Sequence, residues 1–178
     1  MNKRSLSFVL YGIASLILTL SLSMYIKRVS ILGGGDVLIT AIVFVKNLEV
    51  LCIPILFSEI TVLLVGITFR KNMRYVFYSA LLLSIAYFIF AVVVWYISAY
   101  PILYQQKVEV LRTAIGILGF FVFLFGTAVM IHLKDTKVGT LGSVFILLTA
   151  HPLILCLFGG FLQLAGALLI AIALWKKE

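Results

Sequence analysis

Charge is what this sequence has least of. Only 11% of its 178 residues are charged, against about 25% in soluble domains. With 14 Lys and Arg, six Asp and Glu and two His, the chain has too few titratable groups for a well-furnished soluble active site. Hydrophobic residues make up 64% of the chain and the mean hydropathy is +1.26, which excludes a soluble globular protein.

Cysteine is also scarce, and its placement excludes several kinds of site. Cys52 and Cys156 lie in different apolar segments, without the Cys-x-x-Cys or Cys/His spacing of zinc and redox motifs. We expect two reduced thiols in the core and no metal site. The sequence also lacks a Ser/His/Asp arrangement, paired carboxylates on one helix face and an Asp-rich metal motif. We therefore expect no catalytic residues and no enzymatic activity.

Acidic residues are fewer than basic ones, giving a net charge of +8. The basic residues stand singly or in pairs at the ends of apolar runs, where Lys and Arg anchor helices at lipid headgroups. This placement differs from the clustered basic patch that binds nucleic acid. The lipid bilayer is therefore the expected partner, and nucleic acid is not.

What the sequence does have is uncharged runs that can cross a bilayer, because about 20 helical residues cover about 30 Å of hydrocarbon. Charged residues mark the ends of such runs, since each costs about 2.5 to 3.5 kcal/mol at a helix centre. The first run exceeds the length of a signal-peptide core, so we interpret it as a retained helix. The sequence predicts an all-α integral membrane protein with a single polytopic domain, a bundle of five transmembrane helices at about 5–26, 50–69, 75–97, 113–133 and 152–175.

The last uncharged run, residues 138–175, is too long for one crossing and must break. A break at His151-Pro152 gives a partial segment at 139–150 and five spans. A break at Gly159-Gly160 gives six spans, which places nine Lys and Arg on the cytoplasmic side and five outside, as the positive-inside rule prefers. We adopt five, because the halves of a six-span hairpin are close to the minimum crossing length of about 17 residues.

The connection after the first span contains Gly33-Gly34-Gly35-Asp36 and a short apolar run. We predict an interfacial or re-entrant helix near residues 37–48, with Asp36 as its N-cap. The expected location is the cell membrane, with a cytoplasmic N-terminus. The composition suits a prokaryotic membrane.

One carboxyl lies inside a predicted span. Glu59 is at the middle of 50–69, and Ser15, Tyr87 and Gln163 lie near the same depth on other spans, so we predict an intramembrane polar cluster of these four residues. An intramembrane carboxyl is costly enough to be a functional hypothesis by default. Glu59 is therefore either a proton or cation site or a structural carboxyl that hydrogen-bonds a neighbouring helix.

The two histidines, His132 and His151, lie near one membrane edge in the five-span arrangement. Two imidazoles on adjacent helices can hold a haem or contact a quinone, although the second pair usual in two-haem bundles is absent. Otherwise we expect no cofactor.

Two functions remain open. Stripes of small and polar residues follow every span, and such residues mediate helix contacts in lipid. The first hypothesis is a non-catalytic accessory subunit packed among other subunits of a larger membrane assembly, such as a respiratory or electron-transfer complex. The alternative is a small homo-oligomeric transporter or channel that uses Glu59 for proton or cation coupling.

Overall fold

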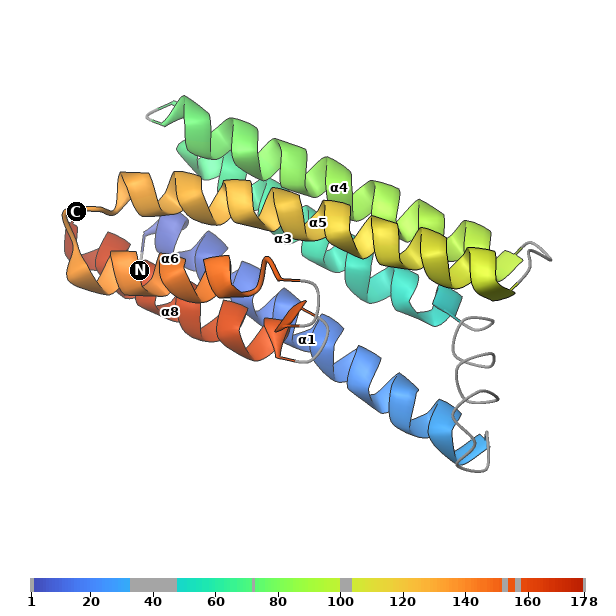
Figure 1. Ribbon diagram of the computed structural model, residues 1–178. Helices are drawn as coiled ribbons and strands as arrows, with labels where there is room; N and C mark the ends of the chain where they lie inside the picture. Colours follow the sequence, from blue (N-terminus) through green and yellow to red (C-terminus); the bar gives the residue numbers. More distant parts are fainter. Residues whose placement is uncertain are drawn as a thin grey trace.

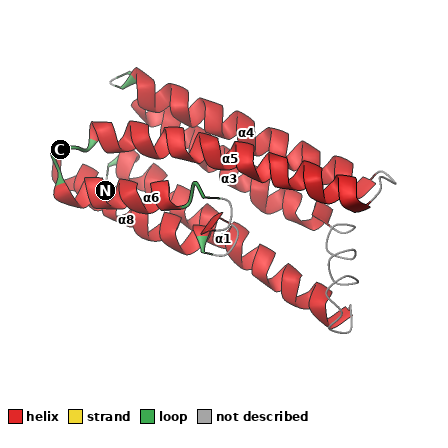
Figure 2. Cartoon of the chain, viewed as in Figure 1, coloured by secondary structure: helices red, strands yellow, loops and turns green. Residues whose placement is uncertain are grey.

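A computed structural model describes residues 2–32, 48–71, 73–99, 104–151, 154–155 and 158–177, and these residues form helices joined by turns, without strands (Figure 2). Five of the helices are long and apolar enough to cross a membrane, which confirms the all-α class and the number of long apolar helices. The elements are α1 (Lys3–Leu32), the 3₁₀ helix η1 (Leu48–Leu51), α3 (Cys52–Phe69), α4 (Arg74–Ala99), α5 (Tyr104–His132), α6 (Lys137–Leu148) and α8 (Gly159–Lys177).

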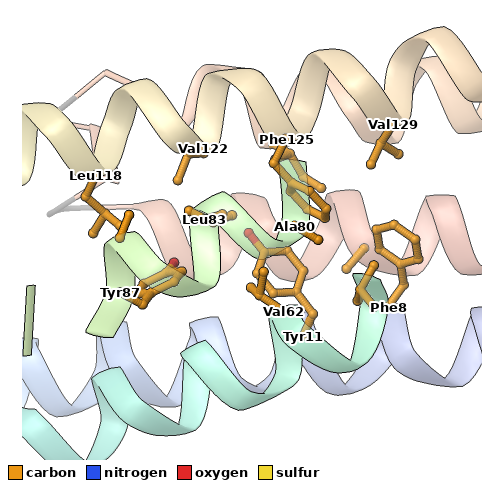
Figure 3. Close-up of a cluster of buried hydrophobic side chains, with 14 of the residues drawn as sticks. Phe8, Tyr11, Val62, Ala80, Leu83, Tyr87, Leu118, Val122, Phe125 and Val129 are labelled. Carbon is orange, nitrogen blue, oxygen red and sulfur yellow. The ribbon is translucent and has the colours of Figure 1, made fainter. Parts of the chain in front are cut away.

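The helices form a closed ring in which each packs against the next (Figure 1). The order of contacts is α1–α3, α3–α4, α4–α5, α5–α6 and α6–α8, and α8 closes the ring against α1. Neighbouring helices run in opposite directions. At the centre, Phe8 and Tyr11 of α1 pack against Phe125 of α5, with ring centroids 6.2 and 5.7 Å apart (Figure 3).

The charged residues mark some helix ends but not all of them. Basic residues follow α3 and α5 as predicted. The helices α1 and α5 nevertheless extend beyond the predicted spans, and α5 begins at Tyr104 with exposed Glu109 and Arg112 in its first turns. The physical reason is that charged residues are good helix formers. They limit which part of a helix enters lipid, and the helix continues past them.

The last uncharged run forms an antiparallel pair, α6 and α8, joined by a turn that includes His151 and Phe158. The predicted partial segment corresponds to α6, whereas the predicted span at 152–175 begins later, at Gly159. The two helices approach closely through Gly142 and Gly166: a Cβ atom added to either would lie 2.6 Å from the carbonyl oxygen of the other.

The helix α8 then returns along α1. Asn2 Nδ2 donates to the Leu174 carbonyl oxygen at 3.3 Å, and Ser5 Oγ donates to that of Ala171 at 2.9 Å. Both ends of the chain therefore lie at one end of the bundle (Figure 1), which we call the terminal end. The five-span prediction placed Lys176 and Lys177 opposite the N-terminus and is wrong on this point, because α6 and α8 enter and leave from the same end.

The α6–α8 pair is shorter than α1 and α5, the helices against which it packs. Its tip reaches Thr19 of α1, against which Gly160 packs, and Gly119 of α5, against which Ala150 packs. Beyond Thr19, α1 continues to Leu32, about 20 Å farther at 1.5 Å per residue. Neither α6 nor α8 fills the space between α1 and α5 beyond the tip. The predicted helix near 37–48 and its N-cap Asp36 lie outside the described residues, except for Leu48 in η1, and Cys156 is also outside them.

Candidate ligand site inside the bundle

A cavity of about 190 Å³ lies beyond the tip of the α6–α8 pair. It is partly open, and nearly all of its surface is apolar. For scale, an engineered dry cavity of about 150 Å³ in another protein holds benzene. The lining residues are Ser15, Leu18, Thr19 and Leu22 of α1, Leu51 and Ile55 before and within α3, Tyr87, Phe90 and Val94 of α4, Leu111, Ile115 and Leu118 of α5, Leu155 near the tip, and Gln163 of α8.

Three of the four residues predicted to form a polar cluster line this cavity. Ser15, Tyr87 and Gln163 come from three helices. Thr19 joins them, and the prediction missed it. We call these four polar residues of the lining the polar floor. The available signal was its spacing, because a residue one turn after Ser15 shares its helix face.

Two hydrogen bonds hold this polar floor in place. The Gly160 N–H donates to Thr19 Oγ1 at 2.8 Å. Amide groups in the first turn of a helix have no partner within that helix, so α1 supplies a partner for α8. Gln163 Nε2 donates to Thr149 Oγ1 at 2.9 Å, which links α8 to the end of α6. These bonds join the tip of the α6–α8 pair to α1, and they join its two helices to each other.

Ser15 differs from two other buried serines of the bundle. Ser58 and Ser143 donate to carbonyl oxygens one turn earlier, at 3.1 and 2.9 Å. Ser15 Oγ is buried without a hydrogen-bond partner, and so is Tyr11 Oη. The two residues are four apart on α1 and lie next to each other. Figure 3 shows the Tyr11 and Tyr87 hydroxyl groups directed into the interior of the bundle.

Glu59 lies apart from this floor. It is half-buried on α3 and does not line the cavity. Cys52 and Gly66, seven residues to either side, face α4: Cys52 Sγ donates to the Ala91 carbonyl oxygen at 3.6 Å, and a Cβ added to Gly66 would lie 3.0 Å from that of Ala80. Residues seven apart lie on nearly the same face of a helix. Glu59 is therefore on the face of α3 that packs against α4, which we call the α3–α4 seam.

The two histidines are also apart. His132 is at the terminal end, where its ring meets Phe69 edge to face at 5.5 Å. His151 is exposed in the turn after α6, and α6 separates the two by about 18 Å of helix. They do not form the predicted pair for haem or quinone. Within the described part of the chain, no group of three or more His, Cys, Asp or Glu side chains is placed to hold a metal ion.

Fold and hydropathy together define a multi-pass helical membrane protein. No protein family, curated protein or solved structure matches the chain.

Proposed function

We propose that this protein is a non-catalytic membrane protein that binds an uncharged, lipid-soluble molecule in the cavity between α1, α3, α4, α5 and the tip of the α6–α8 pair. The observation that carries the proposal is the cavity itself. It has the volume of a small organic molecule, apolar walls and a partly open side.

The chemistry of the lining side chains favours an uncharged, apolar ligand. Its described side chains are Leu, Ile, Val and Phe with four neutral polar groups, and none of these described lining residues is Lys, Arg, Asp or Glu. A charged ligand would lose its hydration without gaining an ion pair, which costs several kcal/mol. An apolar body instead replaces empty space with van der Waals contacts.

The assembly-subunit hypothesis stays a prediction, and one of its supports is weaker. Several small residues of the predicted stripes contact other helices of the same chain. A Cβ added to Gly12 would lie 2.9 Å from that of Ala167, and one added to Gly126 would lie 3.0 Å from Leu147 Cδ2. Gly116 is different, since nothing lies within 4 Å of the added Cβ.

The transporter hypothesis also stays a prediction. Glu59 does not line the cavity, so a ligand held there does not contact its carboxyl group. Under the binding proposal we expect Glu59→Gln to leave ligand binding unchanged, whereas the transporter hypothesis expects the same substitution to abolish flux in proteoliposomes.

Native mass spectrometry of the protein purified from its own membranes in mild detergent tests the proposal. We expect a bound small molecule that is lost from Leu22→Trp, because Leu22 lines the cavity. Leu20→Trp is the matched control, since Leu20 is on the same helix, outside the lining and 43% exposed. A wild-type protein without a bound molecule, or a molecule retained equally by both variants, would contradict the proposal. Copurifying protein subunits would support the assembly hypothesis.

The distribution of basic residues supports an orientation in the cell membrane. Nine of the 14 Lys and Arg lie at the terminal end or in its turns: Lys3, Arg4, Arg70, Lys71, Arg74, Lys134, Lys137, Lys176 and Lys177. Cytoplasmic loops carry an excess of Lys and Arg. We therefore place the terminal end, with both chain termini, in the cytoplasm.

A further inference from the structure

We infer that the ligand presents a hydrogen-bond acceptor, of the carbonyl class, to Ser15 in the polar floor of the cavity. This inference rests on the proposed function and names the chemical group that the site recognises. The ligand is then an uncharged molecule with an apolar ring or chain and an oxygen acceptor at its leading end.

The first observation is the position of the Ser15 hydroxyl. Ser15 is 2% exposed and lines the cavity, yet its Oγ has no partner. Serines in helices commonly donate to the carbonyl oxygen one turn earlier, and Ser143 does so in this bundle. An unmade hydrogen bond at a buried donor carries the desolvation cost of that group. A bound acceptor in the cavity removes this cost.

The second observation is Tyr11 directly behind Ser15. Its Oη is also without a hydrogen-bond partner, and the residue is fully buried. The Ser15 O–H donates to the oxygen of the ligand, and the neighbouring Tyr11 O–H is placed to donate to Ser15 Oγ, so the three oxygens form a chain. Hydrogen bonds in such a chain polarise and strengthen one another.

Two of the other three polar residues of the floor have partners within the protein. Thr19 Oγ1 accepts from Gly160, and Gln163 Nε2 donates to Thr149. These two residues shape the floor and hold the tip of the α6–α8 pair. Of the two that remain, Ser15 and Tyr87, Ser15 is the one whose buried oxygen has no hydrogen-bond partner.

Two probes of nearly the same shape test the inference. Acetophenone carries a carbonyl acceptor, whereas ethylbenzene has the same ring with a methylene in its place. Binding of each is measured from the thermal stabilisation of the protein in lipid nanodiscs, since a ligand that binds only the folded state raises its stability. Each probe is compared across variants at one probe-to-lipid ratio, so its partitioning into lipid cancels.

We expect Ser15→Ala to weaken acetophenone binding about threefold to tenfold, the range for one neutral hydrogen bond, and to leave ethylbenzene binding unchanged. Ser143→Ala is the control, because Ser143 is fully buried outside the cavity. With ¹³C-carbonyl acetophenone, the infrared carbonyl band of the bound probe is expected to lie at lower frequency in wild type than in Ser15→Ala.

The outcomes separate the inference from the function on which it rests. If both probes bind and Ser15→Ala changes neither the affinity ratio nor the carbonyl band, the acceptor inference is overturned while cavity binding stands. If neither probe stabilises the wild-type protein, both the inference and the proposed function fall.

Discussion

At the scale of single residues, the two unpartnered hydroxyls of Tyr11 and Ser15 lower the stability of the bundle. A buried polar group without a hydrogen bond costs about 1 to 3 kcal/mol. We therefore expect Ser15→Ala, without ligand, to raise the free energy of unfolding by about 1 kcal/mol. Ser5→Ala should lower it, because Ser5 Oγ donates to the Ala171 carbonyl oxygen. Thermal unfolding in one detergent measures both, and a less stable Ser15→Ala protein would contradict the prediction.

Glycines provide a second test at this scale. A Cβ added to Gly160 would collide with Thr19 Oγ1 and with the Ser15 carbonyl oxygen. Overpacking of this kind typically costs about 1 to 3 kcal/mol, so we expect Gly160→Ala to lower the unfolding midpoint. Gly116→Ala is the control, because a Cβ there meets nothing within 4 Å. Equal midpoints for the two variants would show that α8 does not pack against α1 as described.

The residues of the site were partly predictable from the sequence. Counting 1.5 Å per residue from the charged ends converts a residue number into a depth, and this placed Ser15, Tyr87 and Gln163 at one level. The same count placed Glu59 there, although it lies on the α3–α4 seam. The depth of a residue does not specify toward which neighbouring helix its side chain points. That depends on how the helix is rotated, which is set by packing between segments far apart in the sequence.

At the scale of elements, the tip of the α6–α8 pair depends on the bond between Gln163 and Thr149. We expect Thr149→Val, which keeps the shape and removes the acceptor, to lower the free energy of unfolding by about 0.6 kcal/mol, the average measured for hydrogen bonds between membrane helices, and by no more than the measured maximum of about 1.7 kcal/mol. Cavity binding should weaken as well, because Gln163 is part of the floor. Both effects are measured by thermal unfolding with and without acetophenone.

A matched threonine keeps this test specific. Thr113 Oγ1 donates only locally, to the Glu109 carbonyl oxygen, and the residue is exposed. Thr113→Val is expected to change neither stability nor binding. If Thr149→Val behaves in the same way as Thr113→Val, the bond does not fix the tip.

The helices themselves were more predictable than their pairing. Runs of apolar residues between charges located five long helices, and the two sequence breaks, His151-Pro152 and Gly159-Gly160, bracket the turn that the structure shows. The direction of α8 was not predictable in this way. It depends on Gly142 and Gly166 meeting across the pair, and a single sequence does not show which glycines meet.

At the scale of the whole molecule, the cavity is a consequence of unequal lengths. The α6–α8 pair packs against α1 and α5 only from the terminal end to Thr19 and Gly119, and both long helices continue beyond that level. The polar floor caps the filled part, and the apolar walls continue beyond it. Because the tip is anchored by Gly160 and Gln163, floor and ring form one structure, and ligand binding should stabilise the whole bundle.

The ring also predicts the sidedness of the chain, because it places both termini at one end. In a background with Cys52 and Cys156 replaced, we expect Lys71→Cys and Lys176→Cys to react with a membrane-impermeant maleimide only in inverted vesicles. Glu109→Cys, at the opposite end of the bundle, should react only in vesicles of the native orientation. Each of the three residues is exposed, so access depends on the side of the membrane.

Two outcomes would contradict this arrangement. If Lys176→Cys reacted in the same vesicles as Glu109→Cys, the C-terminus would be on the opposite side from the N-terminus. The chain would then cross an odd number of times, and the antiparallel α6–α8 pair would be wrong. If each of the three variants reacted only in the vesicles of the orientation opposite to the expected one, the α6–α8 pair would stand and the terminal end would lie outside the cell.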